Sequence, residues 1–322
     1  MSLKTRLILY DKTKKSLNNI INKNKCIEYD NNKQKLILIN NIILEKRIGS
    51  SSVNGLIMLS SVNNNKVIIK IASINKDNLD EIKLSKKITT DIILKHNIPH
   101  FVINYTYFIC EAKNLSNICP KNNKNYKDLC YYFGNKKYYM CINELADGDL
   151  FSLIRKKNTK LFRLSIIKNF IAQMFISVYS LHYYLNYSHN DTHLGNFLYV
   201  KIPHSNNDYY HYIINGKDYY LKNKGYIIIL TDFGRSTKKI NIANEPITYR
   251  SDYELPLTLK NNYINYNLFK FRNFFKNIIN LSFGKIYQDE KSFINEQLET
   301  LMKLKLNKND IIINKDTPYV IG

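Results

Sequence analysis

Two polar segments, each bordered by apolar runs, constrain most strongly what this chain can fold into. They are Ser188–Asn196 (SHNDTHLGN) and Thr231–Gly234 (TDFG). An apolar stretch close to helical period, Phe162–Tyr184, precedes the first segment, and a strand-like run, Phe197–Val200, follows it. Another strand-like run, Tyr226–Leu230, leads directly into the second segment. Either short motif alone would often occur by chance. Both motifs together, each beside the expected helix or strand, would occur by chance far more rarely.

The side chains in these segments suit one kind of chemistry. Asp191 and Asn196 lie five positions apart on one loop, and Asp232 follows the second strand. A carboxylate at Asp191 can accept a proton from an attacking hydroxyl group, and the amide oxygen of Asn196 can bind a metal ion. The Asp232 carboxylate can complete a Mg²⁺ shell around phosphate oxygens. Positioning and charge neutralisation of this type supply most of the catalysis in phosphoryl transfer.

The order and spacing of the two segments resemble the catalytic loop and the D-F-G segment of protein kinases. Two positions depart from the usual pattern, because Asn190 stands where most protein kinases have Arg, and His193 where most have Lys. The pattern H-x-D-x-H-x-x-N is similar to haspin-type kinases, to protein kinases of large DNA viruses and to small-molecule kinases of the aminoglycoside or choline type. The resemblance implies that His193 stabilises the γ-phosphate; the alternative is a hydrogen bond that holds the loop.

Upstream, Leu44–Leu59 is typical of two strands joined by a turn of small residues. Small residues allow backbone N–H groups to approach phosphates closely. The segment resembles a kinase glycine-rich loop, and the resemblance implies phosphate contacts at Gly49, Ser51 and Gly55. It departs from that loop because Ser51 replaces the middle glycine and Gly55 is one position late. An ordinary Ser/Asn hairpin would have the same sequence pattern.

A lysine embedded in a β-branched run, Lys66–Ala72, predicts an ion pair. Burial of an unpaired ammonium group is costly, so Lys70 needs an acidic partner. In kinases the corresponding lysine reaches the α- and β-phosphates and pairs with a glutamate on the next helix. That helix is expected at Leu79–Leu94 and resembles the one in casein-kinase-1-like enzymes, with Glu81 as the partner. Asp91 is the alternative partner, and a solvated Glu81 the alternative role.

The strand Tyr138–Asn143 runs into a segment that resembles a kinase hinge. This resemblance implies that Ile142 stands at the back of an adenine pocket and that backbone groups of Asn143 and Leu145 bind the adenine edge. It also implies that Asp149 faces the ribose hydroxyl groups. Asp149 could equally cap the helix that follows it.

The resemblance implies an α+β, bilobal, protein-kinase-like fold with a β-rich N-lobe and a mainly helical C-lobe with a shortened tail. The expected divisions are an extension at 1–43, an N-lobe at 44–142, a hinge at 143–148 and a C-lobe at 149–322 that carries a hairpin-like insertion at 201–224. The basic, Asn-rich extension is expected to pack on the N-lobe, with a partly disordered arm as the alternative.

Weaker patterns mark the two ends of the chain. The extension has a helix-like patch at Ser16–Ile21 and a strand-like run at Lys35–Ile39. After Gly234 there is no A-P-E motif, and helices are expected at about Asn265–Leu281 and Ser292–Lys305. The resemblance therefore covers roughly residues 44–240.

Composition limits the partners and the compartment. The 322 residues contain 48 Lys and Arg against 26 Asp and Glu, a formal charge of +22 that favours acidic partners. No apolar run approaches the length that spans a bilayer. Five cysteines without C-x-x-C spacing indicate reduced thiols and a cytoplasmic location; they are Cys26, Cys110, Cys119, Cys130 and Cys141. Abundant Asn, Lys, Ile and Tyr indicate AT-rich coding, and with the motifs this pattern resembles kinases of large nucleocytoplasmic DNA viruses, whose virion would be a second location.

Taken together, the resemblance implies an ATP- and Mg²⁺-dependent (or Mn²⁺-dependent) protein serine/threonine kinase. Protein substrates, including acidic, virion or host proteins, are the expected partners, and nucleic acid is a secondary one. Three alternatives stay open: a small-molecule kinase, a pseudokinase scaffold, and a basic nucleic-acid-binding protein on a kinase-like frame.

Overall fold

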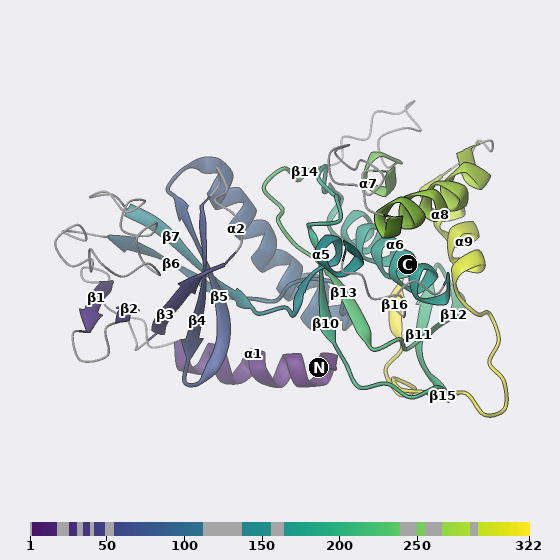
Figure 1. The fold of residues 1–322 in the computed structure, drawn as a ribbon, viewed down its shortest axis with the longest axis horizontal. Helices are drawn as coiled ribbons and strands as arrows, with labels where there is room; N and C mark the ends of the chain where they lie inside the picture. The colour runs from purple at the N-terminus through teal and green to yellow at the C-terminus, as the bar shows by residue number, and fades with distance from the viewer. Residues whose placement is uncertain are drawn as a thin grey trace. The chain divides into compact units, whose positions relative to one another are not determined.

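The computed structural model describes residues 2–17, 26–30, 35–38, 42–48, 55–111, 137–155, 164–238, 250–254, 266–283 and 289–322. The chain forms two compact units (Figure 1). The N-terminal unit comprises residues 4–86 and 102–145, and the C-terminal unit comprises residues 1–3, 87–101 and 146–322. The architecture is α+β, with an antiparallel sheet in the first unit and most of the helices in the second.

The N-terminal unit is built on a seven-stranded antiparallel sheet in the order β1-β2-β3-β4-β5-β7-β6. Its strands are β1 (Ile27–Asp30), β2 (Lys35–Leu38), β3 (Ile42–Arg47), β4 (Leu56–Val62), β5 (Asn65–Ser73), β6 (Asn104–Glu111) and β7 (Lys137–Glu144). Alternating burial along β4 and β5 reflects the period-2 pattern of their apolar residues. The strands and the helix expected between residues 44 and 144 agree with the structure to within a few residues.

Two helices lie on opposite faces of this sheet, α1 (Leu3–Leu17) and α2 (Lys76–Ile88) (Figure 1). Lys70 lies opposite Cys141 in the β5–β7 ladder, so both side chains share the face that bears α2. Glu144 is three positions beyond Cys141 and therefore points to the other face, where it contacts α1.

The N-terminal helix corrects the sequence-based boundaries. The expected helical patch at Ser16–Ile21 overlaps only the last turn of α1, and residues 18–21 lie outside the described residues. The buried positions of α1 recur at helical spacing but include Arg6 and Thr13. A search for apolar periodicity misses such a helix because polar residues occupy its buried face. The strand expected at Lys35–Ile39 is present as β2.

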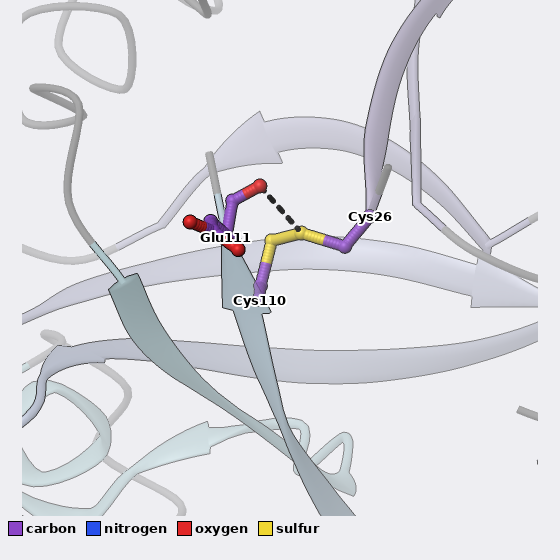
Figure 2. The surroundings of a disulfide bond; sticks show 3 residues. All are labelled: Cys26, Cys110 and Glu111. Carbon is purple, nitrogen blue, oxygen red and sulfur yellow. Dashed lines mark hydrogen bonds between the residues drawn. A yellow bond between two sulfur atoms is a disulfide. The ribbon is translucent and has the colours of Figure 1, made fainter. Parts of the chain in front are cut away.

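A disulfide bond joins the two edges of the sheet. Cys26 precedes β1 and Cys110 lies in β6, and their Cα atoms are 5.4 Å apart (Figure 2). The Cys26 sulfur also lies 3.8 Å from the carbonyl oxygen of Glu111. Because β1 and β6 are the outermost strands in the pairing order, the sheet must curl until its edges meet. This pairing corrects the expectation that these thiols are reduced; Cys141 is free and buried, and Cys119 and Cys130 lie outside the described residues.

The C-terminal unit is organised around helix α6 (Leu164–Leu185), most of whose residues are buried. The Gln173 side chain accepts the Ile228 N–H at 2.8 Å and donates to the Tyr226 carbonyl at 3.1 Å. These bonds tie α6 to β13 (Tyr226–Leu230), which pairs with β10 (Phe197–Lys201). The helix is apolar and long enough to cross a membrane, contrary to the sequence-based expectation, but 78% of its most apolar window is buried inside the fold.

The C-terminal unit contains several further described elements. The insertion forms the hairpin β11 (Asp208–Ile214) and β12 (Lys217–Lys222), and chain segments β15 (Ile311–Ile312) and β16 (Tyr319–Ile321) pair parallel to β11. The remaining elements are the π-helix η2 (Thr89–Leu94), β8 (Gly148–Asp149), α5 (Leu150–Arg155), β9 (Tyr187–Ser188), β14 (Thr237–Lys238), α7 (Arg250–Glu254), α8 (Tyr266–Phe283) and α9 (Glu290–Leu301).

Candidate active site

The polar loop between β9 and β10 holds Asp191 and Asn196 in contact. The Asn196 side-chain amide donates to the backbone carbonyl of Asp191 at 2.8 Å and to its carboxylate at 3.3 Å. Asn190 adopts a left-handed conformation with φ of 61°, which Asn tolerates better than most residues. The loop therefore turns tightly and places both side chains on one side of it.

Asp252 of α7 anchors this loop and was not foreseen from the sequence. Its buried carboxylate accepts the backbone N–H groups of His189 and Asn190, each at 2.6 Å. Its backbone carbonyl accepts the hydroxyl group of Thr192 at 2.5 Å. Burial raises the pKa of Asp252, but hydrogen bonds from His182 and the His189 N–H outweigh burial and lower it. The only sequence signal is an acidic residue beside an aromatic one, which is too common to identify an anchor.

The anchor extends to helix α9 through a buried histidine. His182 lies 2.9 Å from a carboxylate oxygen of Asp252 through Nε2 and 2.5 Å from a carboxylate oxygen of Glu290 through Nδ1. Tyr253 donates to the same Glu290 oxygen at 2.8 Å. A histidine that donates from both ring nitrogens carries a positive charge, so an imidazolium between two carboxylates satisfies this arrangement.

Two basic side chains flank the Asp191 carboxylate. His193 Nε2 lies 3.8 Å from one oxygen and Arg235 Nη1 lies 3.5 Å from the other. The Gly195 N–H donates to His193 Nδ1 at 3.1 Å, which directs Nε2 toward Asp191. A Cβ atom at Gly195 would lie 2.9 Å from the His193 ring, so a larger residue there would displace the ring from this position. The hydrogen-bonding role considered for His193 is therefore present, whereas its role toward a γ-phosphate stays a prediction.

Asp232 lies directly beyond β13 and close to the same loop. Its φ of 62° is left-handed, a conformation that non-glycine residues adopt at functional sites more often than elsewhere. The Thr231 N–H donates to the Asn196 carbonyl at 3.0 Å, which joins the two polar segments. The next side chain, Phe233, packs against the rings of His189 and Phe101, with centroids 5.2 and 6.5 Å away.

The donors Asn196 and Asp232 fit a magnesium ion that is shared with phosphate. The Asn196 amide nitrogen is occupied by Asp191, which leaves its amide oxygen as the atom for a cation. A carboxylate and an amide oxygen are hard ligands, and Mg²⁺ is usually bound by one or two protein groups plus phosphates and water. Among the described residues, no cluster of three or more His, Cys, Asp or Glu side chains could hold a metal alone.

In the N-terminal unit, Lys70 forms the expected ion pair with Glu81. The two charged atoms are 2.5 Å apart, and the side chains are 16% and 8% exposed. Cys141, opposite Lys70 in the ladder, is buried beside this pair, and burial raises the pKa of its thiol to about 12. The alternative partner, Asp91, lies in η2 and accepts a hydrogen bond from Thr90 at 2.7 Å.

Three residues of the segment that resembles a glycine-rich loop were expected to contact phosphate. Gly49 and Ser51 lie outside the described residues, and Gly55 is described. Gly55 has φ of 137°, and a Cβ atom there would lie 2.2 Å from the carbonyl oxygen of Ile71. The neighbouring strand therefore already requires glycine at this position. A phosphate contact at these three residues stays a prediction.

The segment after β7 differs in part from the sequence-based interpretation. Ile142 points away from the face that bears Lys70, so it cannot form the back of a pocket on that face; Cys141 and Asn143 occupy the Lys70 side. Asn143 lies within the ladder, and Leu145 is the first residue beyond it. The Asp149 carboxylate accepts the Ser152 N–H at 2.7 Å and caps α5, the alternative role considered for it.

The fold and these two groups of residues define a protein-kinase-like chain. A lysine–glutamate pair on a sheet and helix, an Asp–Asn loop after a buried helix, and a D-F-G segment after a buried strand occur in the order that protein kinases use. The likeness extends over both units. The N-terminal unit carries the Lys70–Glu81 pair, and the C-terminal unit carries Asp191, Asn196 and Asp232.

One comparison with known proteins agrees with this class. The chain is 28% identical over 158 residues to the probable serine/threonine-protein kinase 380R of Invertebrate iridescent virus 6. The match covers 48% of this chain and about a quarter (26%) of that protein. A crystal structure of a kinase domain matches with 19% identity and a TM-score of 0.42, over 64% of this chain and 54% of that one, a likeness too distant to assign function. No family model matches the chain.

Proposed function

We propose that the protein transfers the γ-phosphoryl group of ATP to Ser or Thr hydroxyl groups of protein substrates. The observation that carries the proposal is the loop in which Asn196 bonds to Asp191 while Asp252 holds the surrounding backbone. A general base must be held within reach of the proton that it accepts, and this loop restrains Asp191 at both backbone and side chain.

In the proposed step, Asp191 accepts the proton of the substrate hydroxyl group as the hydroxyl oxygen bonds to the γ-phosphorus. The bond between the γ-phosphorus and the bridging oxygen breaks, and ADP leaves with that electron pair. Lys70, oriented by Glu81, would neutralise the phosphates of the nucleotide. Bound Mg²⁺ (or Mn²⁺), held by Asn196 and Asp232, would supply further charge neutralisation.

The finer parts of the proposal have separate support. The preference for Ser or Thr follows the description of the iridescent-virus relative as a probable serine/threonine kinase. The formal charge of +22 supports acidic protein partners. A cytoplasmic location is also part of the proposal, although a disulfide bond such as Cys26–Cys110 is more typical of oxidising compartments.

The test is a γ-phosphate transfer assay with Mg-ATP on casein, basic proteins and aminoglycosides. The wild type should label protein, and Asp191→Asn should lower the rate by about two to four orders of magnitude. Asp218→Asn is the matched control, because Asp218 is an exposed carboxylate of the same unit, and this variant should keep full activity. Equal labelling by wild type and Asp191→Asn would contradict the proposal.

Other outcomes would favour the alternatives. Label on an aminoglycoside alone would indicate a small-molecule kinase, and Mg-ATP binding without transfer would indicate a pseudokinase. A nucleotide site should give thermal stabilisation by Mg-ATP that survives moderate salt, whereas polyanion binding weakens steeply with salt. Stabilisation by nucleic acid and not by Mg-ATP would replace the proposal with a scaffold role.

A further inference from the structure

A buried ion pair connects the N-terminal helix to the end of β7. The Arg6 guanidinium donates to both carboxylate oxygens of Glu144, from Nε at 2.9 Å and from Nη2 at 2.5 Å. The two side chains are 0% and 3% exposed, and they are 138 residues apart in the sequence. A bidentate pair of this kind fixes the orientation of both side chains as well as their separation.

The Glu144 carboxylate also holds the segment that leads into β6. One of its oxygens accepts the Ile103 N–H at 2.9 Å, and the Glu144 N–H donates to the Ile103 carbonyl at 3.0 Å. Glu144, the last residue of β7, thus connects that strand to α1 through Arg6 and to the start of β6 through Ile103. Leu145, the first residue beyond the ladder, follows it directly.

Further contacts hold α1 against the same sheet. The Tyr10 ring stacks on Tyr105 of β6, with centroids 6.0 Å apart. Near the other end of the helix, Asn63 in the β4–β5 turn donates to the Ser16 hydroxyl at 2.9 Å. Arg6 therefore lies on a helix that is docked against the sheet by contacts at Tyr10 and Ser16.

Stability alone does not explain this pair. Two charges lose their hydration on burial, and apolar residues of similar volume often stabilise a fold equally well or better. What the ion pair adds is one defined geometry for the end of β7. We propose that Arg6 is a positioning residue for nucleotide binding, because it orients Glu144 and thereby the segment directly after β7, whose backbone would meet the nucleotide base. This inference rests on the proposed function.

The test separates stability from positioning with four variants. Arg6→Met leaves a buried carboxylate unpaired, so it should lower the melting temperature and raise the KM for ATP. The double variant Arg6→Met/Glu144→Met removes both charges and should recover the melting temperature. Its KM for ATP should stay raised by about tenfold, with kcat within about threefold of wild type, because the Ile103 N–H and Leu145 lose their anchor.

Arg6→Lys keeps the charge but loses the bidentate contact, so it should fold and show an intermediate KM for ATP. Glu45→Gln is the control, since the Lys66–Glu45 pair lies on the same sheet but is far less buried than Arg6–Glu144, with its lysine half exposed, and it should change neither quantity. A wild-type KM in the double variant or in Arg6→Lys would overturn the positioning role alone. A wild-type protein that binds no Mg-ATP would overturn the proposed function and this inference with it.

Discussion

The carboxylate of Asp252 accepts the backbone N–H of His189 at 2.6 Å, although the two residues are 63 positions apart. The second oxygen of the same carboxylate accepts the N–H of Asn190, so one buried side chain fixes two successive peptide groups. The position of Asp191, the next residue in this loop, therefore depends on an acidic residue of helix α7, which is distant in the sequence. A site built in this way is sensitive to changes that never touch a substrate.

Asp252→Asn should impair activity more than stability. An Asn side chain has one acceptor oxygen, so its NH₂ group would face one of the N–H donors that Asp252 now binds. The loop that carries Asp191 would lose a hydrogen bond to a charged acceptor, and under the proposed function kcat should fall by about 10- to 100-fold. Steady-state kinetics with Mg-ATP and casein would measure it, with Asp218→Asn as the exposed control. Unchanged kcat in a folded Asp252→Asn protein would mean that the loop is held by other contacts.

The Lys70–Glu81 pair predicts a different kinetic signature. Lys70→Met removes the charge that would face the nucleotide phosphates, so activity should fall by about two orders of magnitude. Glu81→Gln keeps a hydrogen-bond acceptor but removes the charge that orients Lys70. Its activity should therefore fall less than that of Lys70→Met. If the two residues act as a unit, the double variant should be no worse than Lys70→Met. Additive losses would show that Glu81 acts independently of Lys70.

Residues with a local reason to be noticed could be found from the sequence. Asp191, Asn196 and Asp232 adjoin apolar runs that predict buried elements, and Lys70 stands out because a lysine within a strand needs a partner. The expectation that Glu81 supplies this partner agrees with the structure. The main strands and the long core helix could also be predicted, because apolar periodicity is a pattern of neighbouring residues in the sequence.

Residues whose partners are distant in the chain could not be found in this way. Arg6 meets Glu144 and Asp252 meets His189 only after the chain has folded, and neither residue belongs to a motif. The Cys26–Cys110 bond depends on how far the sheet curls, which strand patterns do not reveal. Ile142 was placed on the wrong face because the register of β5 against β7 decides which side chains accompany Lys70.

His189 should make a contribution to stability that is lost below neutral pH. Burial lowers the pKa of this histidine, and the carboxylates of Asp252, Asp232 and Asp191 oppose the effect only in part. The neutral ring fits its surroundings, because Nε2 donates to the Thr231 carbonyl at 2.9 Å and Nδ1 accepts the Asp191 N–H at 3.3 Å.

The sign of the effect follows from proton binding. As the pH falls through about 6.5, His189 takes up a proton in the unfolded chain before it does so in the folded one, so the contribution of His189 to the free energy of unfolding decreases. Urea denaturation at pH 7.5 and pH 5.5 would measure this decrease. His189→Gln should make the pH dependence shallower, and His204→Gln, at an exposed position, should leave it unchanged. An identical slope in wild type and His189→Gln would contradict the prediction.

Residues 235–238, directly after Phe233-Gly234, should need no phosphorylation to become ordered. The Asn190 side-chain amide donates to the Arg235 carbonyl at 3.0 Å and to the Thr237 hydroxyl at 2.9 Å, and β14 pairs with β9. These contacts are neutral, and Asn190 has no charge with which to bind a phosphate dianion. The usual arginine at this position could bind one.

Phosphatase treatment of the purified protein should therefore leave its rate unchanged. Ser236→Ala should have full activity, and Thr237→Ala should lose less than about threefold, because it removes one exposed hydrogen bond. Asn190→Ala removes both contacts of the amide and should lose more than either. Activity would be measured before and after phosphatase treatment, with phosphate release followed by mass spectrometry. A large loss on dephosphorylation would show that a basic residue other than the missing arginine, such as Arg235, binds a regulatory phosphate.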